Sequence, residues 1–341
     1  MIDSIGIIGA GSWGTTLAIL LGEKGYRITL WVRREELLQK MKETRENSVY
    51  LPGFKIPESV ILSHSLKEAV KGQTLIISAV PSHVTRLISQ SYAPYLSPQA
   101  IVVSATKGIE VETLLCMSEV LTAVLPQAAG IGVLSGPSFA REVCQHLPTA
   151  VVAASFHREV AEFIQNLFTT SYFRVYTNLD VIGVELAGAL KNVIALAAGI
   201  SDGLGYGTNS RAALITRGLA EITRLGIAMG AQPLTFAGLA GIGDLVLTCT
   251  GELSRNRQVG LAIGRGQKLN EIIAQMQMVA EGIKTTQAAV RLAKRHAVEM
   301  PITEQVYAML FEGKNPADAV AELMGRSLKP EHPLLEERMA N

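Results

Sequence analysis

The first half of the chain alternates short apolar runs with longer stretches of helical periodicity. The apolar runs, rich in β-branched residues, predict buried strands at 5–8, 27–32, 75–80, 101–104, 132–135 and 151–155. Helical patterns lie between several of these runs, as at 15–24 and 113–125. Strands that are apolar throughout and separated by helices are typical of a parallel sheet covered by helices on both faces.

The pattern changes near Asp180. A strand-like run at 173–176 precedes Asn178 and Asp180, either of which could cap the next helix. Helical patterns then follow one another without strands, at 181–199, 211–229, 258–265, 269–276, 285–294 and 302–311. The sequence therefore predicts an α/β fold of two domains, a parallel-sheet domain over 1–180 and an all-helical domain over 181–341. The polar, proline-spaced residues from about Ser327 are expected to fray.

Composition and charge narrow the class of protein. Hydrophobic residues make up 48% of the 341 residues and charged residues 18%, which excludes a disordered chain. Lys and Arg total 31 against 30 Asp and Glu, so no global basic field exists to collect nucleic acid or an anionic membrane surface. Cys116, Cys144 and Cys249 share no CxxC or zinc spacing, which favours reduced thiols in a cytoplasmic protein without disulfides or a metal site.

Neither apolar segment of the chain has the pattern of a membrane or export signal. Residues 5–10 are apolar but have no basic leader and are too short for a signal-peptide core. Residues 181–200 have about the length of a membrane span but carry Glu185, Lys191 and Asn192, and charges there are costly in lipid. We expect no stable membrane insertion. The Ala- and Gly-rich helices of the second half would also suit a homodimer.

A glycine cluster follows the first predicted strand. Residues 9–14 read Gly-Ala-Gly-Ser-Trp-Gly, which is the G-x-G-x-x-G pattern, and they open a helix that leads to a second strand. In a dinucleotide-binding Rossmann fold Gly9 would allow the tight turn, Gly11 the approach of the pyrophosphate, and Gly14 the close packing of helix on strand. A glycine turn without a ligand and a methyltransferase-like nucleotide fold are the alternatives. The strand–turn–helix context favours the dinucleotide.

The end of the second strand bears on the choice of coenzyme. NAD-binding folds usually carry an acidic residue there, which bonds the ribose 2′-hydroxyl. This chain has Arg33 and Arg34 instead, and guanidinium groups can clamp a 2′-phosphate. Glu35 and Glu36 follow directly, so a solvated cluster of paired charges is the alternative. We expect NADPH as the coenzyme, with NADH also possible.

Three loops follow predicted strands at the edge where open α/β sheets bind ligands. They are 79–82, 105–108 with Lys107, and 136–140 with Gly136 and Ser138. A lysine in a loop is usually solvated, but its position at this edge makes Lys107 a candidate.

Lys191 stands in a helix otherwise made of Ala, Gly, Leu and Val. Desolvation lowers the pKa of a lysine and suits it to proton transfer near neutral pH. A structural pair with Glu185 is the alternative, although six residues place the two poorly on one helical face. We favour a catalytic role for Lys191.

A third cluster combines a carboxylate with groups that suit a phosphate. Residues 241–245 read Gly-Ile-Gly-Asp-Leu and present Asp244, and Ser254, Arg255 and Asn256 follow at a predicted helix start. A hydroxyl, a guanidinium and an amide at a helix N-terminus can together bind a phosphate as a cradle. The alternative is that Ser254 only caps the helix and Arg255 is solvated.

These motifs belong to a larger set that extends from Gly9 to about Gly325. The set also contains Ala-Thr-Lys-Gly, Ser-Gly-Pro-Ser-Phe-Ala, Leu-Lys-Asn and Val-Ala-Glu-Gly. The chain resembles the bacterial NAD(P)-dependent glycerol-3-phosphate dehydrogenases. The resemblance implies cofactor contacts at Ser12, Trp13, Arg33, Arg34, Tyr50, Lys107, Ala140, Arg255, Val279 and Glu281. It implies substrate contacts at Lys107, Gly136, Ser138, Lys191, Asp244, Ser254, Arg255 and Asn256.

The resemblance implies reversible reduction of dihydroxyacetone phosphate to sn-glycerol 3-phosphate. Lys191 would transfer the proton, Lys107 would add positive potential, and Arg255 and Asn256 would hold the phosphate. Asp244 would orient Lys191 or a substrate hydroxyl. A non-catalytic NADPH-sensing module is the alternative to an enzyme. Such a module would need neither a buried lysine nor a phosphate cradle, so Lys191 and Arg255 argue against it. Within enzymes, a related 3-hydroxyacid dehydrogenase acting on a carboxylate substrate is the alternative.

Overall fold

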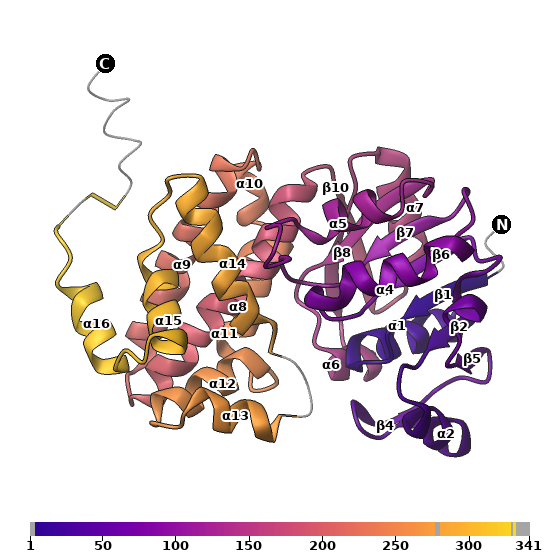
Figure 1. Cartoon of the computed structure of the whole chain (residues 1–341), viewed down its shortest axis with the longest axis horizontal. Coiled ribbons are helices and arrows are strands. Elements are labelled where there is room, and N and C mark those ends of the chain that lie inside the picture. The colour runs from indigo at the N-terminus through magenta and orange to yellow at the C-terminus, as the bar shows by residue number, and fades with distance from the viewer. Residues whose placement is uncertain (1–3, 277–279, 329, 332–341) are drawn as a thin grey trace.

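A computed structural model of the chain describes residues 4–276, 280–328 and 330–331. Its elements form two halves that lie side by side, a sheet with flanking helices and a group of helices (Figure 1). Val279 lies outside the described residues, as does most of the segment from Ser327 that we expected to fray.

One eight-stranded sheet organises the first half. Its strand order is β10-β9-β8-β7-β6-β1-β2-β5, with β1 at the turning point of the chain path. The strands are β1 (Ser4–Ile8), β2 (Arg27–Trp31), β5 (Val60–Ser63), β6 (Leu75–Ser78), β7 (Ile101–Ser104), β8 (Gly130–Ser135), β9 (Thr149–Ala154) and β10 (Phe173–Asn178). All seven strands expected from the sequence are confirmed. The edge strand β5 and a small two-stranded sheet of β3 (Glu46–Asn47) and β4 (Leu51–Lys55) were not foreseen.

The expectation of a wholly parallel sheet is wrong at one place. Strands β9 and β10 are parallel to each other, but β9 pairs antiparallel with β8. Between β8 and β9 the only helix is α6 (Ala140–Cys144), whose five residues span about 7.5 Å. A six-residue strand is roughly 20 Å long, so this connection stays at one end of the sheet instead of crossing it.

Helices cover both faces of the sheet (Figure 1). They are α1 (Ser12–Glu23), α2 (Glu35–Thr44), α3 (Leu66–Val70), α4 (Thr85–Tyr92), α5 (Met117–Val124), α6 and α7 (Arg158–Phe168). The helix expected at 113–125 begins later, at Met117. The cause is local, because the Glu119 carboxylate accepts a hydrogen bond from the Cys116 N–H and Leu114 has a φ of 66°.

The second half is helical throughout its described elements. They are α8 (Val181–Gly203), α9 (Thr208–Ala228), α10 (Pro233–Phe236), α11 (Asp244–Thr250), α12 (Arg255–Gly264), α13 (Leu269–Gln275), α14 (Glu281–Arg295), α15 (Pro301–Phe311) and α16 (Pro316–Met324). The six expected helices are confirmed within a few residues at each end. The Asp180 side chain caps α8 by accepting a hydrogen bond from the Gly183 N–H.

Helix α8 is the core of the second half. By length and hydropathy it could cross a membrane, but 94% of its most apolar window is buried against other parts of the protein. Segment Pro233–Thr250 passes the same test with 44% of its window buried, and it contains the kinked segment Leu239–Gly243. The apolar surface of α8 is therefore covered by the fold itself.

The two halves are joined by a packed apolar contact. Buried Val133 and Val152 from the sheet contact Val181 and Val184 from α8 and Ala240 from the second half.

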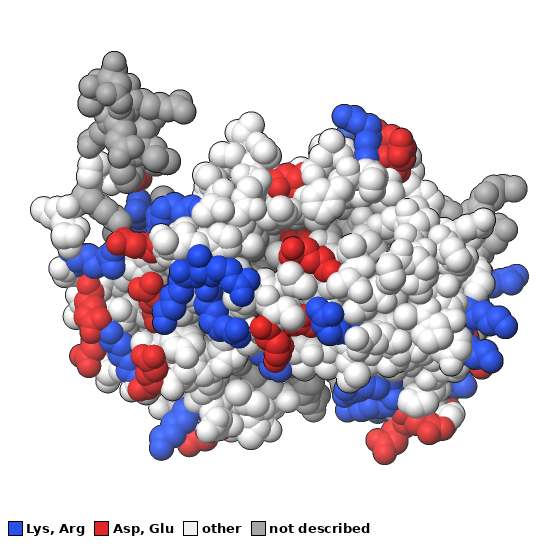
Figure 2. All heavy atoms as spheres, turned by 45° about the horizontal axis from the view of Figure 1, so that its top comes forward, with Lys and Arg blue, Asp and Glu red and all other residues white. Residues whose placement is uncertain are grey.

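Basic and acidic side chains are interspersed over the helical half in Figure 2, where much of the surface over the sheet half is uncharged.

Candidate active site

Three predicted loops meet at one edge of the sheet. Strands β6, β7 and β8 are adjacent and parallel, so the loops that follow them lie side by side. Lys107 comes from the loop after β7 and donates a 2.7 Å hydrogen bond from Nζ to the Gly136 carbonyl oxygen in the loop after β8. The Ser138 hydroxyl donates to the same carbonyl oxygen at 3.0 Å.

Two lysines from different halves of the protein share one buried carboxylate. The Nζ of Lys191 lies 2.5 Å from Asp244 Oδ1, and the Nζ of Lys107 lies 2.7 Å from Asp244 Oδ2. The Asp244 side chain is 1% exposed, that of Lys191 8% and that of Lys107 19%. Because each lysine takes one carboxylate oxygen, their ammonium groups are held close to each other in a largely water-free place.

This arrangement sets the proton affinity of Lys191. Burial lowers its pKa to about 8, and the positive charge of Lys107 lowers it too, while Asp244 opposes the shift. With both lysines protonated, the group of Lys107, Lys191 and Asp244 has a net positive charge. It can therefore stabilise an oxygen that becomes negative and can donate a proton to it near neutral pH.

The structural pair between Lys191 and Glu185 does not form. The Glu185 carboxylate instead accepts hydrogen bonds from the N–H and hydroxyl of Ser118 at the start of α5. Burial raises the pKa of Glu185 to about 7, with the bonds from Ser118 opposing the shift. Glu185 therefore anchors α5, and Lys191 faces Asp244.

The backbone before α11 places Asp244. Segment Leu239–Gly243 is kinked at Gly241, and Asp244 is the first residue of the helix that follows. One turn later the Thr248 hydroxyl accepts a 2.7 Å hydrogen bond from Lys191 Nζ and donates to the Asp244 carbonyl oxygen. Thr248 was not among the residues predicted from the sequence. Its position four residues after the aspartate on one helix was the available signal.

Cys249 does not supply a reactive thiolate to the group of Lys107, Lys191 and Asp244. Cys249 is fully buried, and burial raises the pKa of its thiol to about 12, partly offset by the charge of Lys191. Among the described residues, no group of three His, Cys, Asp or Glu side chains is placed to hold a metal ion.

The three residues of the predicted phosphate cradle stand at the start of α12. Ser254 caps the helix by accepting a 3.3 Å hydrogen bond from the Arg257 N–H, as the alternative interpretation held. The Asn256 amide donates from Nδ2 to Asn192 Oδ1 at 2.9 Å, which ties α12 to the residue after Lys191. The Arg255 side chain is exposed, although protein packs around it closely enough to lower its pKa, and Glu281 opposes this shift.

The glycine loop has the geometry that the sequence predicted. Gly9 has a φ of 114°, and a Cβ on Gly14 would lie 1.9 Å from the Gly9 carbonyl oxygen, so both positions require glycine. A Cβ on Gly11 would meet no atom within 4 Å. The loop thus faces open space at the start of α1, where backbone N–H groups can bind a pyrophosphate. The residues present fit a dinucleotide.

Arg33 and Arg34 are exposed at the end of β2. Arg34 donates a 2.9 Å hydrogen bond to the Tyr50 hydroxyl, and its guanidinium lies 5.3 Å from the centre of the Tyr50 ring. Within the described part of the chain neither arginine forms an ion pair with Glu35 or Glu36. The two guanidinium groups are therefore not neutralised by the carboxylates that follow them in sequence.

The other predicted cofactor residues lie near the glycine loop or opposite it. Ser12 and Trp13 open α1, and the centre of the Trp13 ring lies 6.5 Å from that of Phe173. The Ala140 carbonyl oxygen accepts a 3.4 Å hydrogen bond from the Thr16 hydroxyl of α1. Glu281 begins α14 in the helical half and bonds Ser82 after β6. The structure thus forms two groups: one around Lys191, and one around the glycine loop.

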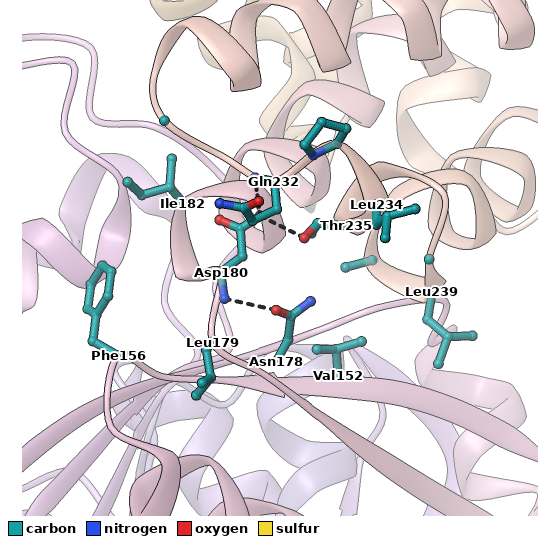
Figure 3. A pocket seen from close by; sticks show the side chains of 14 residues that line it. Val152, Phe156, Asn178, Leu179, Asp180, Ile182, Gln232, Leu234, Thr235 and Leu239 are labelled. Atoms are coloured by element: carbon teal, nitrogen blue, oxygen red, sulfur yellow. Dashed lines mark hydrogen bonds between the residues drawn. The ribbon is translucent and has the colours of Figure 1, made fainter.

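A cavity of about 730 Å³ lies apart from both groups (Figure 3). Phe156, Leu179, Ile182 and Leu234 are among its lining residues, and none of the predicted site residues lines it. Figure 3 shows Asp180 at its wall, where the carboxylate accepts from the Thr235 hydroxyl at 2.6 Å. These polar contacts join α8 to α10 and do not create a second catalytic group.

Comparisons with known proteins find the same family over both halves of the chain. The family described as NAD-dependent glycerol-3-phosphate dehydrogenase matches with its N-terminal part over residues 4–161 and with its C-terminal part over residues 180–321. The chain belongs to this family. Glycerol-3-phosphate dehydrogenases [NAD(P)+] from Geobacter sulfurreducens and Geobacter sp. strain M21 are 59% and 58% identical over 333 residues, which is 97% of this chain and 99% of each relative.

A solved structure extends the similarity to the fold. The crystal structure of glycerol-3-phosphate dehydrogenase from Coxiella burnetii superposes with a TM-score of 0.92 at 42% identity, over 95% of this chain and 99% of that one. Family membership makes the protein an oxidoreductase that uses NAD(P)H, and it supports the Rossmann-type interpretation of the first half. The unliganded turn and the methyltransferase-like fold are thereby excluded.

Proposed function

We propose that this protein catalyses the reversible NAD(P)H-dependent reduction of dihydroxyacetone phosphate to sn-glycerol 3-phosphate, the precursor of glycerophospholipids. The observation that carries the proposal is the buried group of Lys191, Asp244 and Lys107 in a chain of the glycerol-3-phosphate dehydrogenase family. The reaction reduces a ketone, so it needs a hydride donor, a proton donor at the carbonyl oxygen and a hold on the phosphate.

Each of these three requirements has a candidate group, either on the coenzyme or on the protein. The coenzyme supplies the hydride when bound. Protonated Lys191 donates its proton to the carbonyl oxygen, and neutral Lys191 accepts a proton in the oxidative direction. Lys107 adds positive potential at the oxygen, and Asp244 fixes both ammonium groups. Because Asp244 remains bonded to Lys107, its carboxylate keeps a partner while Lys191 is neutral.

The phosphate is assigned to the start of α12. Arg255 offers a guanidinium there, and Asn256 and Ser254 offer an amide and a hydroxyl. Gly136 and Ser138 complete the substrate side through their contacts with Lys107 and with each other. Since the net charge of the chain is only +1, capture of the anionic substrate depends on these local groups.

We assign the coenzyme to residues 1–180 and the substrate phosphate to residues 181–341. On the coenzyme side, the loop shaped by Gly9, Gly11 and Gly14 would bind the pyrophosphate at the start of α1, together with Ser12 and Trp13. Arg33, Arg34 and Tyr50 would bind the adenosine end. We further propose a cytoplasmic enzyme without membrane insertion or nucleic-acid partner, consistent with the burial of α8 and with the mixed surface charge. We also propose that two copies of the chain can form a homodimer.

A direct assay tests the function. The protein is mixed with dihydroxyacetone phosphate and either NADPH or NADH, and the loss of reduced-coenzyme absorbance is followed. Absorbance loss that requires dihydroxyacetone phosphate and yields glycerol 3-phosphate is the expected result. If the protein instead oxidises coenzyme only with a 3-oxoacid carboxylate, the substrate assignment is wrong.

Arg33→Asp should weaken NADPH binding selectively. The substitution removes a cation from the end of β2 and adds an anion that repels a 2′-phosphate, at a cost of about 1–3 kcal/mol in binding. Dissociation constants for NADPH and NADH are measured by coenzyme fluorescence. Arg27→Asp, at the exposed amino end of the same strand, is the matched control. Equal losses for both coenzymes in Arg33→Asp would show that Arg33 does not bind the 2′-phosphate.

A further inference from the structure

Asn47 is a fully buried polar residue that bonds the glycine loop. Its side-chain amide donates from Nδ2 to the Ala10 carbonyl oxygen at 3.0 Å and to the Thr15 hydroxyl of α1 at 2.8 Å. Its Oδ1 accepts a 3.2 Å hydrogen bond from the Tyr50 N–H. Both hydrogens of the amide and one acceptor site of its oxygen are therefore used, although the side chain is 0% exposed.

The small sheet of β3 and β4 places Asn47 beside the loop. The pairing of the two strands shifts register between Glu46 and Asn47. The Glu46 carboxylate accepts a 2.9 Å hydrogen bond from the Gly53 N–H, which ties β3 to β4. The Arg45 guanidinium donates a 3.0 Å bond to the carbonyl oxygen of Val60, the first residue of β5. The hairpin is therefore fixed to the main sheet, and Asn47 is held with it.

The bond from Asn47 sets the direction of one peptide group in the glycine loop. None of the described peptide bonds is cis, and in a trans peptide the C=O and the following N–H point to opposite sides. Because the Ala10 carbonyl oxygen points at Asn47, the N–H of Gly11 points away from Asn47, and the space at Gly11 is open. This N–H belongs to the loop that we assign to the pyrophosphate.

Tyr50 connects Asn47 to the adenosine end of the coenzyme site. The Tyr50 N–H bonds Asn47, and the Tyr50 hydroxyl accepts the 2.9 Å hydrogen bond from Arg34. The guanidinium of Arg34 also lies over the Tyr50 ring, so these two side chains form one unit, the Arg34–Tyr50 pair. One buried amide thus bonds both the loop assigned to the pyrophosphate and the residue that holds Arg34.

We propose that Asn47 is a positioning residue for the coenzyme, which fixes the spacing between the glycine loop and the Arg34–Tyr50 pair so that one NADPH molecule reaches both. The inference rests on the coenzyme placement given under the proposed function. Because Asn47 is fully buried, it acts through these groups and does not touch the coenzyme. Without Asn47 each group still binds its own part of the coenzyme, but a molecule that spans both loses the gain from linking them.

The test compares NADPH with adenosine 2′-monophosphate, which carries only the adenosine end of the coenzyme. Asn47→Ala removes all three hydrogen bonds, so the dissociation constant of NADPH should rise about tenfold. That of adenosine 2′-monophosphate should rise less than about threefold, because a small probe follows the Arg34–Tyr50 pair wherever it moves.

NADH is the second probe in the same variant. It lacks the 2′-phosphate that the arginines would bind, so it gains less from the fixed spacing and should be weakened less than about threefold. Coenzyme fluorescence gives the dissociation constants of NADPH and NADH, and titration calorimetry gives that of adenosine 2′-monophosphate.

Thr15→Val tests the same link if Asn47→Ala does not fold. Valine has nearly the shape of threonine but no hydroxyl, so Asn47 keeps its bonds to Ala10 and Tyr50 and loses one of its three. The order of the losses should be the same, with the dissociation constant of NADPH rising about threefold.

Ser155→Ala is the matched control for loss of a buried hydrogen bond. The fully buried Ser155 hydroxyl donates to the Ile131 carbonyl oxygen at 2.8 Å. Ser155 follows β9, and because β9 is antiparallel to β8, its carboxyl end lies at the edge of the sheet opposite the glycine loop. We expect Ser155→Ala to leave all three dissociation constants unchanged. Thermal unfolding of each variant shows whether it is folded.

Three results would overturn the inference. Asn47→Ala could leave NADPH binding unchanged, or it could weaken adenosine 2′-monophosphate as strongly as NADPH, in which case Asn47 only supports the Arg34–Tyr50 pair. It could also weaken NADH as strongly as NADPH, in which case Asn47 acts on the glycine loop alone.

Failure of the proposed function has different signs, because it appears in proteins that keep Asn47. If the coenzyme placement is wrong, Arg34→Ala leaves the binding of adenosine 2′-monophosphate unchanged. If the reaction is wrong, the unsubstituted protein does not reduce dihydroxyacetone phosphate, and the dissociation constants measured for Asn47→Ala do not depend on that result.

Discussion

Lys191→Met should abolish turnover while leaving the fold intact. Methionine replaces most of the lysine stem in the buried α8 environment, and Asp244 keeps its 2.7 Å ion pair with Lys107. The proton donor is lost, so kcat should fall at least 10²-fold, the usual effect of removing a general acid. NADPH affinity should remain close to that of the unsubstituted protein, because Lys191 lies apart from the glycine loop. Asp244 Oδ1 and the Thr248 hydroxyl each lose a hydrogen-bond donor, so the thermal unfolding temperature should fall while the protein stays folded.

The pH dependence of the unsubstituted enzyme checks the same assignment. Burial lowers the pKa of Lys191 to about 8, below the ordinary value of 10.5. Reduction needs the protonated form, so its rate should fall as the pH rises through about 8, and oxidation, which needs the neutral form, should rise over the same range. If Lys191→Met keeps turnover within a few-fold, Lys191 is structural and this assignment is wrong.

Dihydroxyacetone should be a very poor substrate, and Arg255→Gln should narrow the difference between it and its phosphate ester. The phosphate supplies binding energy that positions the carbonyl carbon, and Arg255 is the cation assigned to it in a chain with a net charge of only +1. Losing a charge-assisted hydrogen bond should lower kcat/KM for the phosphorylated substrate roughly 10- to 100-fold. Activity toward dihydroxyacetone should change little.

The comparison is made at saturating NADPH, because Arg255 is also a candidate contact for the coenzyme. Arg265→Gln, at the exposed far end of the same helix, is the matched control and should leave both specificity constants unchanged. A uniform loss for both substrates in Arg255→Gln would mean that Arg255 serves the coenzyme or the fold. The phosphate site would then have to be sought around Lys107.

Local patterns predicted seven strands of the main sheet but neither the edge strand β5 nor the direction of β9. The runs at 27–32 and 101–104 are apolar because they are buried on both faces, and burial on both faces is visible in sequence. The direction of β9 depends on whether its connection crosses the sheet, which the residues of that connection do not encode. Strand β5 was missed because it is a four-residue edge strand with Ile61 half exposed.

The candidate site also contains some residues that the sequence predicts and others that only the structure reveals. Gly9 and Gly14 were predictable because a positive φ and a contact of helix on strand require glycine at fixed spacing. Lys191 was predictable because a lysine in an apolar helix needs a partner or a role. Thr248 was missed because its spacing from Asp244 is common in helices, and its contact with Lys191 comes from a segment that is distant in sequence.

The sequence by itself determined the fold class, the glycine loop, the arginines after the second strand and the family, because each depends on residues that are neighbours in the chain. Only the tertiary structure decided which charges meet. Asp244 could have paired with Lys191, with Lys107 or with both, and it is bonded to both because β7, α8 and α11 converge on it. Glu185 could have paired with Lys191 but bonds Ser118 instead. Charge pairing depends on distances of a few ångströms between segments far apart in the chain, and only the packing of α8 against the sheet sets those distances.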